Sequence, residues 1–196
     1  MLSLDPFDRF DRLFARAREA GEPDASAHVL ATASAGQPSA RYLLLKGVDG
    51  GGFVFFTNYR SRKAQDLAAN PSAAVCFYWP RIGAEVTARG AVERITAAES
   101  DAYFTCRPRG SRLGAWASRQ SLPLGWRPWL VVRWLFFAAR FFARPVPRPP
   151  FWGGFRLQPD VIEFVQHEPN GASEHTIYTR ADDAWRHEVH FAWRIP

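Results

Sequence analysis

A run of hydroxyls and cations extends from Thr57 to Lys63. It reads Thr-Asn-Tyr-Arg-Ser-Arg-Lys and includes Ser61 and Arg62. A strand is expected before the run, and a short helix is expected after Ser61, a residue type that favours the N-cap position. Backbone N–H groups, the helix dipole and cationic side chains would then converge on one point. The run therefore predicts a phosphate site, with a solvated basic turn as the alternative.

Two further segments carry groups that could reach a ligand. The expected strand 39–46 has Arg41 near its start and Lys46 at its end. Because side chains alternate along a strand, a separation of five places these two on opposite faces unless a bulge intervenes. The segment from Tyr103 to Ser121 combines arginines, hydroxyls and aromatic rings with glycine and proline. Such a set can grip a second phosphate and stack on a ring.

Hydrophobic periodicity and turn residues predict the elements that hold these groups. Helices are expected over 7–20 and over 61–70, where Asn70-Pro71 is a stop signal, and a capping box at Thr96–Glu99 opens a third helix. Strands are expected over 28–32, 39–46, 53–57, 73–79, 84–95, 155–157, 161–166, 176–180 and 185–191. Most links between strands are too short for the crossover helices of a parallel sheet.

The expected fold class is mainly β with helices (α+β), an antiparallel, Greek-key-like barrel. A single domain over 1–196 is expected, since no linker or repeat divides the chain. Its barrel core would cover about 26–95 and 152–191, with helical segments over about 5–20, 61–70 and 97–142.

Composition and charge narrow the class of function. The chain has 196 residues, 47% of them hydrophobic, a net charge of +6 and a pI near 9.9. Its cations form short clusters and not one block, which suits phosphate groups on small molecules better than a nucleic acid. Two cysteines without metal-ligand spacing and an acidic N-terminus predict a reduced, cytoplasmic protein without a metal.

An aromatic and aliphatic run from Trp126 to Phe142 is the one segment that suggests a membrane. Arginines at 127, 133 and 140 interrupt it, and it is shorter than the roughly 20 apolar residues that a crossing helix needs. We expect a buried or dimer-facing helix and no membrane partner. Interfacial membrane contact is the alternative.

The order and spacing of these blocks resemble the pyridoxamine 5'-phosphate oxidase family. The resemblance covers about Asp5 to Trp185. The matching blocks are Arg41–Lys46, Phe53–Lys63, Asn70-Pro71, Phe77–Trp79, Ser100–Ser111, Gly114–Ser121, Trp152–Arg156 and Ile162–Phe164.

This resemblance implies FMN bound in a homodimeric split β-barrel, with the flavin between subunits. The implied FMN contacts are Arg41, Tyr42, Leu43, Leu44, Lys46, Phe56, Thr57, Ser61, Arg62, Lys63, Glu85, Gln120 and Ser121. The implied contacts to the substrate phosphate are Lys46, Tyr103, Arg107 and Ser111. No protein side chain is expected to be catalytic, because the flavin carries the chemistry.

The chain departs from the family pattern at two places. Gly171 and Ser173 stand where the family has an Arg and a His over the substrate, and His175 replaces an Arg that reaches FMN. Glu85 replaces a glutamine that contacts the isoalloxazine. A lost charge-assisted contact costs about 1.5 to 3 kcal/mol. Two such losses predict substrate binding weaker by roughly two to four orders of magnitude.

Three functions are compatible with these residues. The first is an FMN-dependent oxidase that passes a hydride from pyridoxamine or pyridoxine 5'-phosphate to flavin N5, with reoxidation by O2. The second is oxidation of another reduced ring compound, as in phenazine-biosynthesis relatives. The third is a flavin-binding protein with little oxidase activity, which the missing Arg and His favour.

Overall fold

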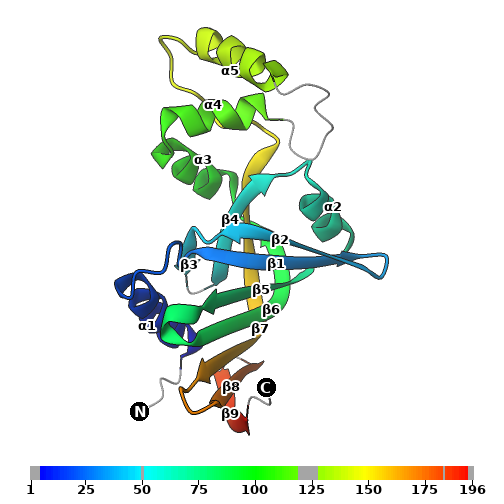
Figure 1. The fold of residues 1–196 in the computed structure, drawn as a ribbon. Helices are drawn as coiled ribbons and strands as arrows, with labels where there is room; N and C mark the ends of the chain where they lie inside the picture. Colours follow the sequence, from blue (N-terminus) through cyan, green and yellow to red (C-terminus); the bar gives the residue numbers. More distant parts are fainter. Residues whose placement is uncertain (1–4, 50, 119–127, 183, 194–196) are drawn as a thin grey trace.

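An antiparallel sheet forms the centre of the computed structural model, which describes residues 5–49, 51–118, 128–182 and 184–193 (Figure 1). The strands are β1 (Ala27–Ser34), β2 (Gln37–Leu44), β3 (Gly47–Asp49), β4 (Gly52–Asn58), β5 (Ser72–Trp79), β6 (Ala84–Arg94), β7 (Trp152–His167), β8 (Ala172–Ala181) and β9 (Ala184–Trp193). The α-helices are α1 (Pro6–Glu19), α2 (Arg62–Ala69), α3 (Ala97–Cys106), α4 (Arg109–Ala117) and α5 (Pro128–Arg140). The expected class, an antiparallel split barrel with helices, is confirmed.

The sheet runs in the order β2-β1-β5-β6-β7-β4-β3 and divides at β7. Along one edge of this long strand lies β6, while its other edge pairs first with β4 and then with β8. The edge strands β2 and β3 are consecutive in the chain and are joined by Leu45 and Lys46. The N–H of Leu45 donates to the Ser26 carbonyl (2.8 Å) and that of Lys46 to the Val54 carbonyl (3.0 Å). The chain thus crosses from one side of the barrel to the other within two residues.

The first helix covers the apolar interior of the barrel. It begins after Asp5, whose carboxylate accepts a hydrogen bond from the Phe7 N–H (2.8 Å). Phe10 is fully buried, and its ring meets those of Phe53 and Phe77 with centroids 5.0 and 5.1 Å apart. The helix predicted over 7–20 is therefore confirmed, because its apolar stripe is what the barrel buries.

Strand β7 is longer than the sequence predicts. Two separate strands, 155–157 and 161–166, are expected from the sequence. In the structure they are one strand, and Pro159 lies opposite Gly90, where the β6–β7 register shifts. A side chain at Gly90 would collide with the backbone of Gln158 and Pro159. The bulge and the missing side chain accommodate a proline inside a paired strand.

Helices α3, α4 and α5 lie together beyond one end of the sheet, while β8 and β9 lie at the other end (Figure 1). A second apolar cluster, formed by Phe104, Leu113, Val146 and Trp152, joins these helices to β7. The helix predicted within the 126–142 run is present as α5 and is not buried within the protomer, while its predicted position facing the dimer partner stays a prediction. No helix in the described part of the chain is long and apolar enough to span a membrane.

Candidate active site

A group of cations and hydroxyls, here called the cation cradle, lies where β1, β2, β4 and α2 meet. It consists of Thr32, Arg41, Thr57, Ser61, Lys63 and Asp66. Arg41 donates to the Thr32 hydroxyl (2.8 Å) and lies 3.6 Å from an Asp66 carboxylate oxygen. The Thr32 hydroxyl donates in turn to Asp66 (2.8 Å). The hairpin of β1 and β2 and the helix α2 therefore hold Arg41 in place together.

Lys63 is the buried member of the cation cradle, with 6% of its surface exposed. Its ammonium donates to the hydroxyls of Thr57 (3.1 Å) and Ser61 (3.3 Å). Ser61 is the N-cap residue of α2, as predicted, but its hydroxyl accepts from Lys63 and does not cap the backbone. Among the described residues no carboxylate contacts the Lys63 ammonium.

The charges of the cation cradle do not balance. Asp66 accepts from the more exposed Arg62 (3.2 Å) as well as pairing with Arg41. Burial raises the pKa of Asp66, but the Thr32 hydroxyl and the two arginines lower it by more, so it stays ionised. Burial, and then the charge of Arg41, lower the pKa of Lys63. With the adjoining Arg62, three cations surround one carboxylate among the described residues, an arrangement that favours binding of an anion.

An aromatic stack lies on the other side of β4 from the cation cradle. Phe56 precedes Thr57, so the two side chains leave β4 on opposite faces. The Phe56 ring stacks on Tyr103 with centroids 3.9 Å apart and on Trp152 at 5.3 Å. The residue predicted to lie near the flavin therefore contacts one predicted to hold the substrate.

Arg107 lies against this stack. Its guanidinium is 4.7 Å from the centre of the Trp152 ring, within the range of a cation–π contact. Its Nη1 atom is buried and has no hydrogen-bond partner among the described residues. Burial lowers the pKa of Arg107, and it raises that of the neighbouring Tyr103 hydroxyl. A buried donor without a partner costs free energy, which an anionic ligand at this position would recover.

Two glycines after Trp152 let the segments before α2 and α3 approach β7 closely. A side chain at Gly153 would collide with the Tyr59 hydroxyl, and one at Gly154 with Ile95. The Gly154 N–H donates to the Ser100 hydroxyl of α3 (3.2 Å). This close contact sets the position of Tyr103 and Arg107 relative to β4.

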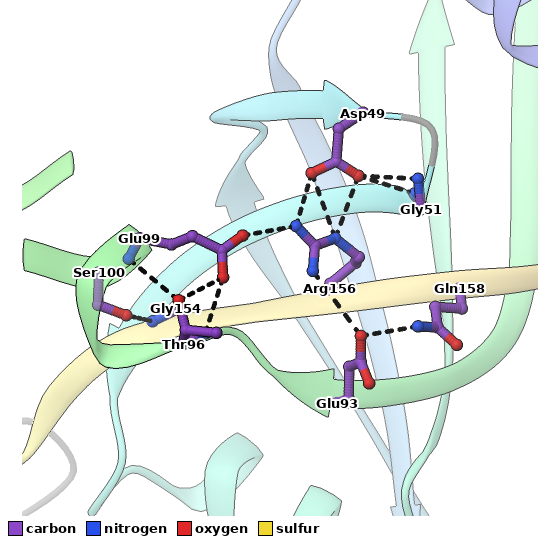
Figure 2. A network of polar contacts seen from close by, with 10 residues as sticks. Asp49, Gly51, Glu93, Thr96, Glu99, Ser100, Gly154, Arg156 and Gln158 are labelled. Atoms are coloured by element: carbon purple, nitrogen blue, oxygen red, sulfur yellow. Dashed lines mark hydrogen bonds and ion pairs between the residues drawn. The ribbon is translucent and has the colours of Figure 1, made fainter. Parts of the chain in front are cut away.

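A polar network around Arg156 fixes the start of the same helix (Figure 2). Arg156 on β7 donates to Asp49 of β3 (2.6 Å) and to Glu99 of α3 (2.8 Å), and it lies 3.7 Å from Glu93 of β6. Glu99 is also the acid of the predicted capping box, which is confirmed: it accepts from the Thr96 N–H (2.9 Å). One arginine thus joins three strands to the helix that carries Tyr103.

Replacing Arg156 by glutamine is expected to lower the melting temperature by roughly 3 to 10 °C. Three carboxylates would lose their common cation, and each of them is about half exposed. We therefore expect the free energy of unfolding to fall by about 1 to 3 kcal/mol, between the effects of breaking a surface and a buried ion pair. The measurement is thermal unfolding followed by circular dichroism, with Arg12→Gln on the exposed face of α1 as control.

Acid should remove the difference in melting temperature between the wild type and Arg156→Gln. Hydrogen bonds from Thr96 and Arg156 lower the pKa of Glu99 to about 2, and a hydrogen bond from Arg156 lowers that of Asp49. Because both values are depressed on folding, their stabilisation is complete above the unfolded pKa of about 4 and disappears as pH falls toward 2. A gap that stayed constant from pH 7 to pH 3 would contradict this role for Arg156.

The two positions that depart from the family pattern are paired within the sheet. Glu85 lies 2.8 Å from the Nε2 atom of His167. His175 lies between Glu163, 3.1 Å from its Nδ1 atom, and Ser173, 3.1 Å from its Nε2 atom. Each histidine therefore has a carboxylate partner on a neighbouring strand.

The remaining predicted site residues are more scattered. Tyr42, Leu44 and Lys46 are exposed, Leu43 is half-buried, and Ser111 lies exposed on α4. Within the protomer, the residues predicted to bind the substrate therefore fall into two groups. Tyr103 and Arg107 lie together, whereas Lys46 and Ser111 are exposed and separate from them. Gln120 and Ser121 lie outside the described residues.

Three residues of the site were not predicted. Asp66 and Thr32 orient Arg41, and Trp152 lies under Arg107. Asp66 could have been found from the sequence, because it lies one helical turn after Arg62, the spacing of an ion pair within a helix. Thr32 and Trp152 meet their partners only through strand pairing and helix packing.

Comparison with known proteins agrees with this architecture. A family model described as pyridoxamine 5'-phosphate oxidase matches residues 15–134, and one described as the pyridoxine 5'-phosphate oxidase C-terminal dimerisation region matches 152–190. The chain is 52% identical to the pyridoxine/pyridoxamine 5'-phosphate oxidase of Anaeromyxobacter dehalogenans (strain 2CP-C), with 92% of each chain covered. It is 47% identical to that of Myxococcus xanthus (strain DK1622), covering 96% of this chain and 92% of the relative.

Solved structures show the same fold. PhzG from Burkholderia lata 383, in complex with tetrahydrophenazine-1-carboxylic acid, has a TM-score of 0.91 at 26% identity, with 96% of this chain and 93% of that chain covered. An FMN-binding protein from Nostoc punctiforme PCC 73102, related to pyridoxamine 5'-phosphate oxidase, has a TM-score of 0.76 at 19% identity, covering 96% and 99%.

The split barrel with its cation cradle is thus that of an FMN-dependent oxidoreductase. The chain belongs to the pyridoxamine 5'-phosphate oxidase family, whose cofactor is FMN, and its dimerisation region makes it a homodimer. The residues present fit this cofactor, since a buried lysine with hydroxyl partners, and with no carboxylate partner in the part of the chain that the structure describes, suits a phosphate group.

Proposed function

We propose that this protein is an FMN-dependent oxidase of a phosphorylated ring compound, with pyridoxine or pyridoxamine 5'-phosphate as the first candidate. The observation that carries the proposal is the presence of two separate cationic positions on opposite sides of β4. One is the cation cradle around Lys63, and the other is Arg107 with its unpartnered Nη1 atom. The first suits the cofactor phosphate and the second a phosphate on the substrate.

The protein side chains bind and orient, and FMN, when bound, supplies the hydride-accepting chemistry. Arg41, Ser61, Arg62 and Lys63 would hold the FMN phosphate, with Thr57 beside it. Tyr103 and Arg107 would hold the substrate phosphate. Phe56 lies between the two groups, so its ring would set the spacing of substrate and cofactor.

The second subunit would complete the site. The outer face of the sheet exposes Tyr42 and Leu44 on β2 and Tyr78 on β5, which is more apolar surface than water-facing strands usually present. We place the dimer interface over this face. Lys46, Glu85, Gln120 and Ser121 would then contribute to the flavin site, with Lys46 and Ser111 reaching the substrate.

A second candidate substrate is a reduced ring compound that carries a carboxylate. It is favoured by Gly171 and Ser173, which stand where the family has an Arg and a His that contact the substrate. It is also favoured by the likeness to PhzG, whose structure was solved with tetrahydrophenazine-1-carboxylic acid. Arg107 would accept a carboxylate as readily as a phosphate. A flavin-binding protein with little oxidase activity is the remaining alternative.

The decisive experiment is anaerobic addition of pyridoxine or pyridoxamine 5'-phosphate to the FMN-loaded protein while the flavin absorbance is followed. Bleaching that reverses on admission of air supports the proposed oxidase. Bleaching with a reduced carboxylated ring, but not with either phosphate, would replace the substrate. A yellow protein that neither class of compound bleaches would leave only the flavin-binding alternative.

A further inference from the structure

The outward side of α5 is entirely apolar. Its exposed side chains repeat at helical spacing and come from Pro128, Val131, Val132, Leu135, Phe136, Ala139 and, just beyond the helix, Phe142. Leu135 is 56% exposed, Phe136 59% and Phe142 85%. A helix with an uncovered side of this kind marks an interaction surface.

The opposite side of the helix is already anchored. Arg133 donates to the Ala117 carbonyl at the end of α4 (2.8 Å), and the rings of Phe137 and Phe141 pack on Trp116. Arg109 of α4 donates to the carbonyls of residues 141, 142 and 144, which follow the last turn of α5. The outward side chains are therefore not needed to hold α5 on the protein.

The charges around α5 indicate what would cover it. From Ala102 to Val146 the sequence contains eight arginines and no aspartate or glutamate. Arg140 and Arg144 are exposed at the C-terminal end of the helix. A second copy of the same surface would bring like charges together, whereas a surface that is apolar inside and anionic outside complements both features.

We propose that α5 is a membrane-surface helix, which lies in the headgroup region of an anionic lipid bilayer. With 13 residues it spans about 20 Å, less than the roughly 30 Å hydrocarbon core, so it would lie in the plane of the membrane. Phe136 and Leu135 would insert, while Arg140 and Arg144 meet lipid phosphates. The helix lies at the opposite end of the molecule from β8 and β9, so docking leaves those strands free (Figure 1).

The test is flotation of the full-length, FMN-loaded protein with vesicles of phosphatidylcholine alone or with 30 mol % phosphatidylglycerol. We expect binding to the anionic vesicles, weakened by high salt. The double variant L135S/F136S should lower the partition coefficient at least about tenfold on them. Arg140→Gln and Arg144→Gln should each lower it about fivefold.

Matched controls lie elsewhere on the surface. Arg12→Gln and Arg16→Gln each remove an exposed cation from α1. Their partition coefficients should equal that of the wild type. Failure of the wild type to float with anionic vesicles, or equal losses in the controls, would overturn the proposal. So would a dimer that L135S/F136S dissociates into monomers, or a larger assembly that it reduces to a dimer, because a second copy would then cover α5.

Discussion

Replacing Lys63 by methionine is expected to stabilise the FMN-free protein while weakening its binding of FMN. The wild-type ammonium is buried among hydroxyls, with no carboxylate on it among the described residues. Methionine fills a similar volume without a charge to desolvate. We expect a gain of about 1 kcal/mol in the free energy of unfolding, or 2 to 4 °C in melting temperature.

The same substitution removes a charge-assisted contact to the proposed FMN phosphate. Loss of such a contact costs about 1.5 to 3 kcal/mol, so the Kd for FMN should rise roughly 10-fold to 150-fold. Flavin fluorescence titration measures the affinity, and melting with and without FMN measures both stabilities. Arg16→Met on the exposed side of α1 is the control. A variant that melts lower without FMN, or binds it as tightly as wild type, would show that Lys63 has a structural role.

Alkaline pH should narrow the stability gap between the two FMN-free proteins. Burial lowers the pKa of Lys63 in the folded state below its unfolded value. The unfolded chain then holds its proton to higher pH, so wild-type stability gains from this group as pH rises through that window toward about 10.4. The methionine variant lacks this titration, and melting curves from pH 7 to pH 10 would reveal the difference.

Replacing Arg107 by methionine should affect substrate binding and not cofactor binding. Under the proposed function, its unpartnered Nη1 atom binds the substrate phosphate. We expect KM for pyridoxine 5'-phosphate to rise roughly 10-fold to 100-fold, which corresponds to about 1.4 to 2.7 kcal/mol. The Kd for FMN should stay unchanged, because Arg107 lies beyond Phe56 from the cation cradle.

Unphosphorylated pyridoxine separates this role from a general disturbance of the site. Its turnover should be the same in wild type and in Arg107→Met, since no phosphate contact is lost. Arg12→Met on α1 provides the surface control. An equal loss of activity toward both substrates would mean that Arg107 acts by packing on Trp152 and not by binding a phosphate.

Local patterns predicted most of the elements, and long-range contacts account for the exceptions. The capping box at Thr96 and the stop at Asn70 involve neighbouring residues, so the sequence alone locates them. Pro159 is different, because its acceptance within β7 depends on Gly90 in a strand nearly seventy positions away. The exposure of α5 was also beyond prediction, since periodicity identifies a helix without showing what covers it.

The same distinction applies to the site. The run from Thr57 to Lys63 predicts an anion site because strand end, cap and cations are contiguous, and the structure brings them together. Asp66 becomes the shared partner of Arg41 and Arg62 only when α2 packs against the hairpin. Arg107 appears in the family pattern, but its unpartnered nitrogen and its position over Trp152 are visible only in three dimensions.

The long β7 strand also bears on when the protein can acquire its cofactor during synthesis. All side chains of the cation cradle lie between residues 32 and 66, so a ribosome produces them early. Strand β4, which carries Thr57, pairs along one edge with β7, with Phe53 opposite Leu157, and β7 is synthesised much later. In a nascent N-terminal half, the groups proposed to bind the FMN phosphate therefore lie beside a strand with an open edge. We therefore expect FMN to bind only after β7 has closed the sheet, and its binding then stabilises the folded chain.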